Sequence, residues 1–449
     1  MSESHRSVFT IPNIRWFLLF RLLFNARFYY PVFTVIFLDY GLTLPQFTIL
    51  NAVWAVTIVL AEVPSGAMAD IFGRRNLMVL AGILMVLEMG IIALAPVGQG
   101  ALVFFLFLIN RVCSGLAEAS ASGADEALAY DTLKDSGQED EWPKVLERLG
   151  RMMAVGLFLA MIIGAFVYDP QWVGAALNFL GLDVSLTRND VIRLPILLTL
   201  LSSFGVLYCA WRMREAKSFQ KTPFSFEQLR HSFVRVFDAG GWILEHRFVL
   251  SVILAGMILD SVARQFVTLG SEYFRFIGIP IGFFGPIWAG MGLLGWLYAK
   301  WARMAVEHLS PLFNLYLLAV ILLTALAGAS AVIPIYGLAF VVPVDAMMLF
   351  VGFLQSHYVN REVDSARRAT VLSFQGLALN IGYGLTSIYH SVVILGIKRG
   401  LPPEAAADSG YVLSVSLLWL PFLLIVLLGA LLWLGRCCLK NSEVIHRAG

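Results

Sequence analysis

The chain has 449 residues, of which 59% are apolar and 14% charged, and its mean hydropathy is +0.78. Soluble domains carry about 45–50% apolar and about 25% charged residues, so this composition excludes an ordinary soluble domain and predicts an integral membrane protein. The net charge of +2 averages two different membrane faces and therefore identifies no partner. We expect a surrounding lipid bilayer, no nucleic-acid partner and no enzymatic activity.

Twelve segments of the sequence are apolar and long enough to cross a hydrocarbon core about 30 Å thick, which takes about 20 helical residues. In chain order they lie near residues 16–38, 46–67, 77–95, 101–124, 148–168, 194–212, 247–270, 282–303, 311–330, 333–357, 368–394 and 411–435. We therefore predict an all-α membrane fold of twelve transmembrane helices in two pseudo-symmetric six-helix bundles. The bundles are residues 1–212 and 247–449, and a cytoplasmic linker at 213–246 carries an amphipathic helix.

Basic residues are distributed unevenly between the two sets of loops. Most lie on the side that also holds both termini, and the other side holds only Arg188, Arg193, Arg275, Lys398 and Arg399. Since Lys and Arg accumulate in cytoplasmic loops, both termini are expected in the cytoplasm and the protein in the cytoplasmic (inner) membrane. The polar start of the chain lacks the apolar core of a removable signal, so the first helix is expected to remain in the mature protein.

Ionisable residues inside the predicted spans recur on every third helix. They are Arg21 and Arg27 on the first span, Arg111 and Glu118 on the fourth, Asp260 and Arg264 on the seventh, and Asp345 on the tenth. An ionised side chain in hydrocarbon costs about 2.5–3.5 kcal/mol or more, so each is expected to face a partner or water. This spacing predicts one polar passage lined by these four helices. Glu62 and Glu88, on the second and third helices, do not follow the spacing.

A short charged turn stands between the second and third spans and reads Gly66-Ala67-Met68-Ala69-Asp70-Ile71-Phe72-Gly73-Arg74-Arg75. We expect Gly66 and Gly73 to let neighbouring helices approach closely, and the two arginines to end the turn on the cytoplasmic side. The turn resembles motif A of the major facilitator superfamily, G-x-L-A-D-[RK]-x-G-[RK]-[RK], with Ile71 in place of the usual base.

Two patterns on the fourth span carry the same resemblance. Arg111-Val112-Cys113-Ser114-Gly115 is similar to motif B of proton-coupled exporters, R-x-x-Q-G, with Ser114 in place of the usual Gln. Residues 122–131 resemble the S-G-A-D-E-A-L-x-Y-D signature of a poorly characterised bacterial group in the superfamily. The resemblance implies two six-helix halves that rock around a substrate site near the membrane midplane.

The resemblance also implies a cytoplasmic gate. Asp70 is expected to face the start of the eleventh helix, where the positive helix end and Arg367 or Arg368 would hold it. The acidic side chains expected to engage Arg74, Arg75 or Arg148 nearby are Asp125, Glu126 and Asp131.

Arg27 has no acidic residue within one helical turn and lies close to the midplane. One interpretation is an anion clamp in which Arg27 and Arg264, at matching positions of the two halves when Gly41 is aligned with Gly278, grip a carboxylate or phosphate. Similar paired arginines occur in organophosphate antiporters of the superfamily, although their histidine on helix 5 is missing here. The alternative is a structural Arg27 bonded to Glu118, Glu88 or backbone carbonyls.

The remaining candidate residues divide between substrate binding and proton coupling. Tyr30, Asp260 and Asp345 join the two arginines as substrate-binding candidates, while Asp260 is also one turn from Arg264 and can pair with it. Glu118 is the first choice for proton coupling, because a proton and a substrate anion could compete for the positive charge of Arg111, and Glu88 is a further candidate.

The sequence thus predicts a secondary active transporter, coupled to protons, that moves a small organic solute with an anionic group as the leading class. Within transport, the competitor is a drug:proton antiporter, suggested by the aromatic residues Phe28, Tyr29, Tyr30 and Trp54. A non-transporting membrane receptor or scaffold is the alternative of another class. We expect a monomer without cofactor or metal. No Walker-type phosphate-binding motif occurs in the sequence, so ATP-driven transport by this chain alone is not expected. The direction of transport stays open.

Overall fold

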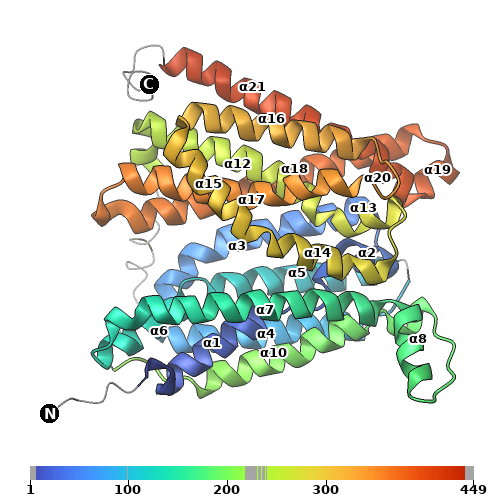
Figure 1. Ribbon diagram of the computed structural model, residues 1–449, viewed down its shortest axis with the longest axis horizontal. Coiled ribbons are helices and arrows are strands. Elements are labelled where there is room, and N and C mark those ends of the chain that lie inside the picture. Colours follow the sequence, from blue (N-terminus) through green and yellow to red (C-terminus); the bar gives the residue numbers. More distant parts are fainter. Residues whose placement is uncertain are drawn as a thin grey trace.

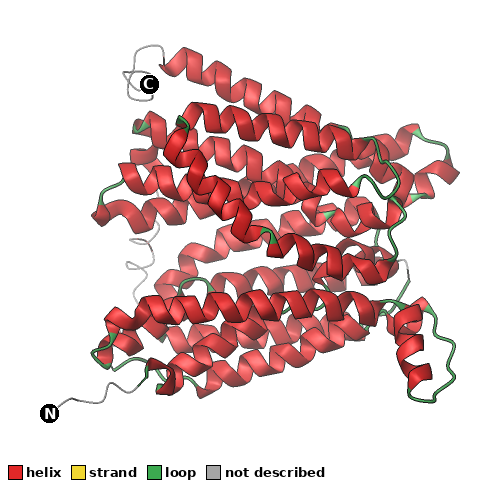
Figure 2. Ribbon diagram, in the orientation of Figure 1, coloured by secondary structure: helices red, strands yellow, loops and turns green. Residues whose placement is uncertain are grey.

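The structure is a computed structural model that describes residues 7–98, 100–217, 230, 234, 238 and 240–439. The side chains of Asp70, Ser365, Ala366, Ala369 and residues 434–439 lie outside that description. Helices and loops account for the described residues, and no strand occurs among them (Figure 2). This confirms the predicted all-α membrane fold.

The helices fall into two groups along the chain. The first group comprises α1 (Pro12–Asn25), α2 (Phe33–Asp39), α3 (Leu44–Phe72), α4 (Arg74–Leu94), α5 (Ala101–Ala121), α6 (Ala124–Asp135), α7 (Trp142–Tyr168), α8 (Pro170–Phe179), α9 (Arg188–Val191) and α10 (Leu194–Arg212). The second comprises α12 (Arg247–Thr268), α13 (Gly270–Phe276), α14 (Phe284–Leu293), α15 (Gly295–His308), α16 (Pro311–Ser330), α17 (Leu338–Glu362), α18 (Ser365–Gly400), α19 (Pro403–Ala407), α20 (Ser409–Leu417) and α21 (Trp419–Leu439). Short 3-10 turns η1 (Val8–Thr10), η2 (Tyr30–Val32), η3 (Glu139–Glu141) and η4 (Ile281–Phe283) join some of them.

The two groups form two bundles that lie side by side with their long helices roughly parallel (Figure 1). We call them the N-half and the C-half. Helix α1 begins and α21 ends at the same end of the molecule, on the left of Figure 1, which we call the proximal end. The opposite end, where α8, α13 and α19 lie, is the distal end. Helix α3 of the N-half and α18 of the C-half are in extensive contact, and together they form the seam between the halves.

Eleven helices or helix pairs of the described residues are long and apolar enough to cross a membrane. They begin with Leu44–Ala69 and end with Ser409–Trp433, and each overlaps one of the predicted spans from the second to the twelfth. The first predicted span, near 16–38, is missing from this set because it is not one continuous helix. The amphipathic helix predicted in the 213–246 linker falls mainly outside the described residues.

The first span is broken in its middle, which corrects the sequence prediction. Helix α1 ends at Asn25, and α2 begins only at Phe33 after the turn η2. Pro31 lacks an N–H, and its ring would clash with the carbonyl of the residue four positions earlier in a continuous helix. The freed backbone finds partners elsewhere: the N–H of Phe28 donates to Oγ1 of Thr199 on α10 at 3.0 Å.

Gly164 on α7 makes room for this unwound segment. A Cβ at that position would lie 1.8 Å from the carbonyl oxygen of Phe28, so only glycine allows the backbone to approach. In the C-half the matching span is also divided, since α12 ends at Thr268 and α13 begins at Gly270. Gly41 and Gly278, which end the two divided spans, both have a positive φ, of 105° and 83°. The alignment of the two halves on these glycines is therefore supported by backbone conformation.

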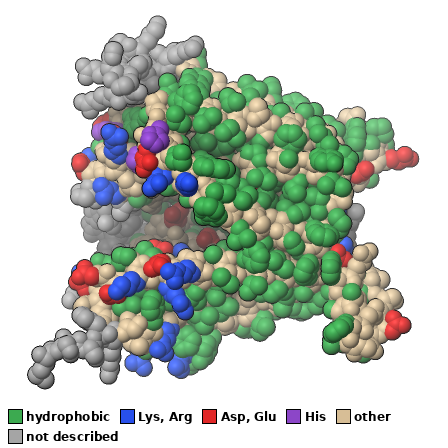
Figure 3. All heavy atoms as spheres, viewed as in Figure 1, with side chains coloured by type: hydrophobic (Ala, Val, Ile, Leu, Met, Phe, Trp, Pro, Cys, Tyr) green, Lys and Arg blue, Asp and Glu red, His purple; other side chains and the backbone are tan. Residues whose placement is uncertain are grey.

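A hollow opens between the halves at the proximal end (Figure 3). Acidic side chains are visible deep inside it, and Lys and Arg side chains lie around its rim together with acidic and His side chains. On the face that Figure 3 shows, hydrophobic side chains cover most of both bundles, as expected for surfaces in contact with lipid.

Candidate functional site

A buried charge cluster occupies the core of the N-half. Nη1 of Arg27 donates to Oε1 of Glu88 at 2.6 Å, and Nη2 of Arg111 lies 3.7 Å from the same oxygen. Their side chains are at most 5% exposed. One carboxylate on α4 thus serves two guanidinium groups, one from the unwound segment after α1 and one from α5.

The surrounding elements hold this cluster in place. The amide of Asn110 on α5 donates to the backbone carbonyl of Glu88 on α4, at 2.9 Å, and accepts from Nε of Arg111 at 3.1 Å. The guanidinium of Arg111 lies over the rings of Phe33 and Phe37 on α2, 5.3 and 5.4 Å from their centroids. The carboxylate of Glu88, the amide of Asn110 and the two aromatic rings together offset the free-energy cost of burying the two positive charges.

Arg264 in the C-half also has an acidic partner. Its Nη2 lies 2.6 Å from Oδ2 of Asp260 one turn earlier on α12, which confirms the predicted local pair. Its Nη1 donates to Oδ1 of Asn380 on α18 at 3.3 Å, and its guanidinium lies 5.5 Å from the centroid of the Tyr383 ring. Both arginines of the expected anion clamp are therefore ion-paired, and for Arg27 the contacts match the structural alternative.

Three carboxylates within the spans are less constrained. Glu118 on α5 is exposed, and Glu62 on α3 and Asp345 on α17 are half-buried. Within the described part of the chain, no side-chain hydrogen bond or ion pair involves these three groups. Glu118 interacts electrostatically with Arg27 and with Tyr30, whose ring is 42% exposed. Glu118 therefore lies beside the buried cluster, with an exposed side chain.

Aromatic side chains connect the halves beside these charges. Trp54 on α3 and Tyr383 on α18 meet edge to face, with ring centroids 6.4 Å apart. The hydroxyl of Tyr383 is within 3.2 Å of Oγ1 of Thr268, at the break between α12 and α13. The divided spans and the seam helices α3 and α18 thus converge on one region.

The distal end is closed by polar contacts between the halves. Nη1 of Arg275, on α13, donates to Oδ1 of Asp39, at the end of α2, at 2.7 Å. Oγ of Ser271 accepts from the backbone N–H groups of Thr34 and Val35, and the hydroxyl of Thr34 donates to the carbonyl of Thr268 at 2.5 Å. Each of these contacts joins α2, the second part of the first span, to α13 or to the end of α12 just before it.

Further groups surround the Asp39–Arg275 pair. Asp39 also accepts from the hydroxyl of Tyr168 at 2.8 Å, and Arg275 pairs with Glu272 at 2.5 Å. The bond from the backbone N–H of Gly282 to Oδ2 of Asp169, at 3.0 Å, adds a second connection between the halves.

The described contacts of the predicted gate residues at the proximal end stay within each half. Arg74 pairs with Asp131 and donates to the carbonyl of Ala127, as the sequence suggested. Asp125, by contrast, pairs with Arg21 at 3.0 Å, and Glu126 does so at 3.1 Å. Two acidic side chains expected near Arg74, Arg75 or Arg148 thus bind an arginine of the first span.

The other motif A positions complete this picture. Arg75 donates to the carbonyls of Trp211 and Met213 at the end of α10, at 3.0 and 2.9 Å. Arg367 and Arg368 are exposed at the start of α18, and the side chain of Asp70, their expected partner, lies outside the described residues.

The first glycine of the motif does not have the role that the sequence suggested. A Cβ on Gly66 would meet no atom within 4 Å, so this glycine does not mediate a close helix contact here. Gly73 serves backbone conformation, with a φ of 94° between α3 and α4.

Comparison with known proteins shows which family the chain belongs to. The sequence model of the Major Facilitator Superfamily matches residues 15–387. The chain belongs to this superfamily. No curated protein matches the sequence significantly.

Solved structures resemble the fold over nearly the full chain. A bacterial homologue of the human lysosomal transporter Spinster, in an inward-facing and unoccupied conformation, is 15% identical with a TM-score of 0.70, covering 98% of this chain and 99% of that one. The nucleoside transporter NupG is 13% identical with a TM-score of 0.65, covering 96% of this chain and 100% of that one. The inward-open xylose transporter XylE from E. coli is 14% identical with a TM-score of 0.54, covering 96% of each chain. At these identities the likeness shows the fold.

Sequence reasoning missed the distal closure. The sequence prediction counts Arg275 only as a basic loop residue and assigns no role to Asp39, although both lie near the ends of two spans that the alignment of Gly41 with Gly278 makes equivalent. That equivalence was the available signal, since equivalent ends of related halves meet near the pseudo-symmetry axis. Among the described residues, no group of three His, Cys, Asp or Glu side chains is arranged to hold a metal ion.

Proposed function

We propose that this chain is a secondary active transporter that carries a small organic solute across the cytoplasmic membrane by alternating access, with protons as the coupling ion. The observation that carries the proposal is the contrast between the hollow that opens at the proximal end (Figure 3) and the polar contacts that join the halves at the distal end. A charge-lined hollow open to one side only is the geometry that alternating access requires. We assign the domains as residues 1–212, 213–246 and 247–449, acting as a monomer.

The orientation follows from the charges at the proximal end. Lys and Arg side chains gather there, and basic residues accumulate on the cytoplasmic side of membrane proteins. We therefore assign the proximal end, with both termini, to the cytoplasm and the conformation to an inward-open state. In the outward-open state the Arg74 and Asp70 region would close the proximal end against the start of α18, near Arg367 and Arg368.

Glu118 is our choice for the coupling group. Its side chain is exposed and its carboxylate interacts with Arg27, whose own partner Glu88 is shared with Arg111. A proton on Glu118 would remove one negative charge from a cluster that holds two positive ones, and so change how strongly the cluster attracts a solute. Glu88, enclosed between the two arginines, would position them and not exchange protons itself.

The ion pairs of the buried arginines indicate which charge the solute can carry. Arg27 and Arg264 are already paired with Glu88 and Asp260, whereas Glu62 and Asp345 lack a basic partner among the described residues. Freeing Arg27 for an anion would leave Glu88 buried with only the more distant Arg111. The exposed ring of Tyr30 and the partly exposed ring of Trp54 add surface suited to aromatic or cationic groups. A neutral or cationic solute, as in the drug:proton antiporter alternative, is therefore our second candidate beside the anionic class.

The coupling assignment is tested with purified protein in liposomes that enclose a pH-sensitive dye. Solute pools are added to parent protein and to Glu118→Gln, with Glu147→Gln on the exposed face of α7 as the matched control. We expect parent and control to move protons with the solute, and Glu118→Gln to exchange solute without moving protons. Proton movement by Glu118→Gln at the parental rate would remove Glu118 from this role.

A further inference from the structure

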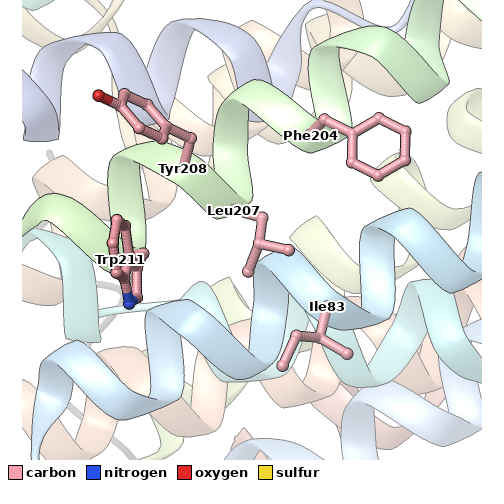
Figure 4. A pocket seen from close by; sticks show the side chains of 5 residues that line it. All are labelled: Ile83, Phe204, Leu207, Tyr208 and Trp211. Atoms are coloured by element: carbon pink, nitrogen blue, oxygen red, sulfur yellow. The ribbon is translucent and has the colours of Figure 1, made fainter.

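A groove lies on the outer face of the N-half, away from the hollow between the halves. Its lining consists of Ile83 on α4 and Phe204, Leu207, Tyr208 and Trp211 on α10 (Figure 4). The helices touch closely at its floor, because a Cβ on Gly82 would lie 2.8 Å from Cα of Leu207. The groove therefore has a narrow floor and apolar walls, and it opens toward the lipid.

The groove has the length of an acyl-chain segment. Phe204 and Trp211 are seven residues apart on α10, which corresponds to about 10 Å along the helix axis at 1.5 Å per residue. Four of the five lining side chains are strongly exposed: Ile83 42%, Phe204 53%, Tyr208 50% and Trp211 62%. A chain of methylene groups can bury these surfaces along its length at about 0.8 kcal/mol per CH₂.

Positive charge stands at the proximal mouth of the groove. The guanidinium of Arg212, the last residue of α10, lies over the rings of Trp16 and Tyr208, 5.6 and 6.0 Å from their centroids. Within the described part of the chain, Arg212 has no acidic partner. Arg75, at the start of α4, is fixed beside it through its bond to the carbonyl of Trp211 at 3.0 Å.

The rings at this mouth mark the level of the membrane interface. Trp16 and Tyr208 meet edge to face with centroids 5.6 Å apart, and Trp211 follows one turn later on α10. Tryptophan and tyrosine concentrate where the hydrocarbon gives way to lipid headgroups. This preference would put Arg212 and Arg75 at the height of the headgroups, next to the apolar groove.

We propose that this groove is a binding site for an anionic phospholipid, with one acyl chain along Phe204, Leu207 and Ile83 and the headgroup phosphate at Arg212 and Arg75. The guanidinium of Arg212, held by two rings and without an acidic partner among the described residues, binds the phosphate through charge-assisted hydrogen bonds. Arg75 is also the last residue of the motif A turn, so an occupied site joins the start of α4 to the end of α10 beside the proximal gate. The lipid thereby stabilises the N-half at its moving end.

The site is tested by thermal unfolding of the purified protein in detergent, with added dioleoylphosphatidylglycerol or dioleoylphosphatidylcholine. A ligand that binds only the folded state raises the melting temperature to an extent set by its affinity. We expect phosphatidylglycerol to stabilise the parent more than phosphatidylcholine of the same chains. Arg212→Gln should weaken its apparent affinity about fivefold, the effect of one basic residue at an anionic lipid surface, while Arg212→Lys should retain most of it.

Two further variants separate the groove from general surface charge. Arg148→Gln removes an exposed arginine of α7 at the same end and should leave the phosphatidylglycerol effect unchanged. Leu207→Trp fills the groove and should reduce the effect of the lipid but not the small effect of glycerol 3-phosphate. Equal stabilisation by both lipids, or equal losses in Arg212→Gln and Arg148→Gln, would overturn the proposal, and stronger binding of glycerol 3-phosphate than of the lipid would do so as well.

Discussion

The two ends of the molecule differ in how the halves meet. At the distal end, Arg275 pairs with Asp39 and Ser271 binds the backbone of Thr34 across the seam. At the proximal end, Arg74 and Arg21 instead pair inside the N-half. Among the described residues, the polar contacts between the halves are thus concentrated at the distal end. The proposed change of state would break those contacts and form others at the opposite end.

The largest effect should come from the charge cluster that lies between the two ends. Replacing Glu88 by Ala leaves Arg27 and Arg111 buried without their shared carboxylate, and removing one partner of a buried pair costs about 3–5 kcal/mol. We expect a large fall in the melting temperature of the purified protein. The exposed Glu147, paired with Arg151, is the control, and its replacement by Ala should cost about 0.5 kcal/mol or less. Equal effects of the two changes would contradict the assigned cluster.

The next largest effect concerns the unwound segment that leads to the distal closure. Gly164→Ala places a Cβ against the carbonyl of Phe28 and should destabilise the fold by about 1–3 kcal/mol through overpacking. Gly150→Ala on the same helix meets no atom within 4 Å and should stabilise it by about 0.5–1 kcal/mol. Opposite shifts in melting temperature are expected, and a stabilising Gly164→Ala would show that the first span is not unwound there.

The smallest effect should appear at the proximal end. Arg74→Gln removes an ion pair whose side chains are 27% and 29% exposed, so we expect a loss of about 1 kcal/mol or less in the free energy of unfolding. We expect a larger fractional loss in the transport rate than in the free energy of unfolding, because the motif A turn has to rearrange when the proximal end closes. A melting temperature that falls as far as in Glu88→Ala would remove the distinction between the two regions.

The sequence predicted long apolar elements better than their interruptions. The spans from α3 to α10 and from α12 to α21 follow from hydrophobic length alone, which hardly depends on tertiary context. The break in the first span was missed, although Pro31 was a visible signal, because the stability of an unwound segment depends on distant partners such as Thr199 and Gly164.

Charge positions were predicted better than charge partners. The rhythm of ionisable residues identified the helices that carry Arg27, Arg264 and Glu118, and the pair of Asp260 with Arg264 followed from helical spacing. The pairing of Arg27 with Glu88, by contrast, depends on how α4 packs against the unwound segment, and no local pattern encodes that distance.

The central claim is that the halves rock, exchanging the distal closure for a proximal one. It is tested most directly by double electron–electron resonance in lipid nanodiscs, after replacement of the native cysteines. One spin-label pair spans the proximal end at Lys134 and His308, and another spans the distal end at Asn178 and Glu404, all at exposed positions. Asp39→Asn weakens the bond to Arg275, so the account predicts that the proximal distance shortens while the distal distance lengthens. Two distances that stay unchanged, or that lengthen together, would contradict it.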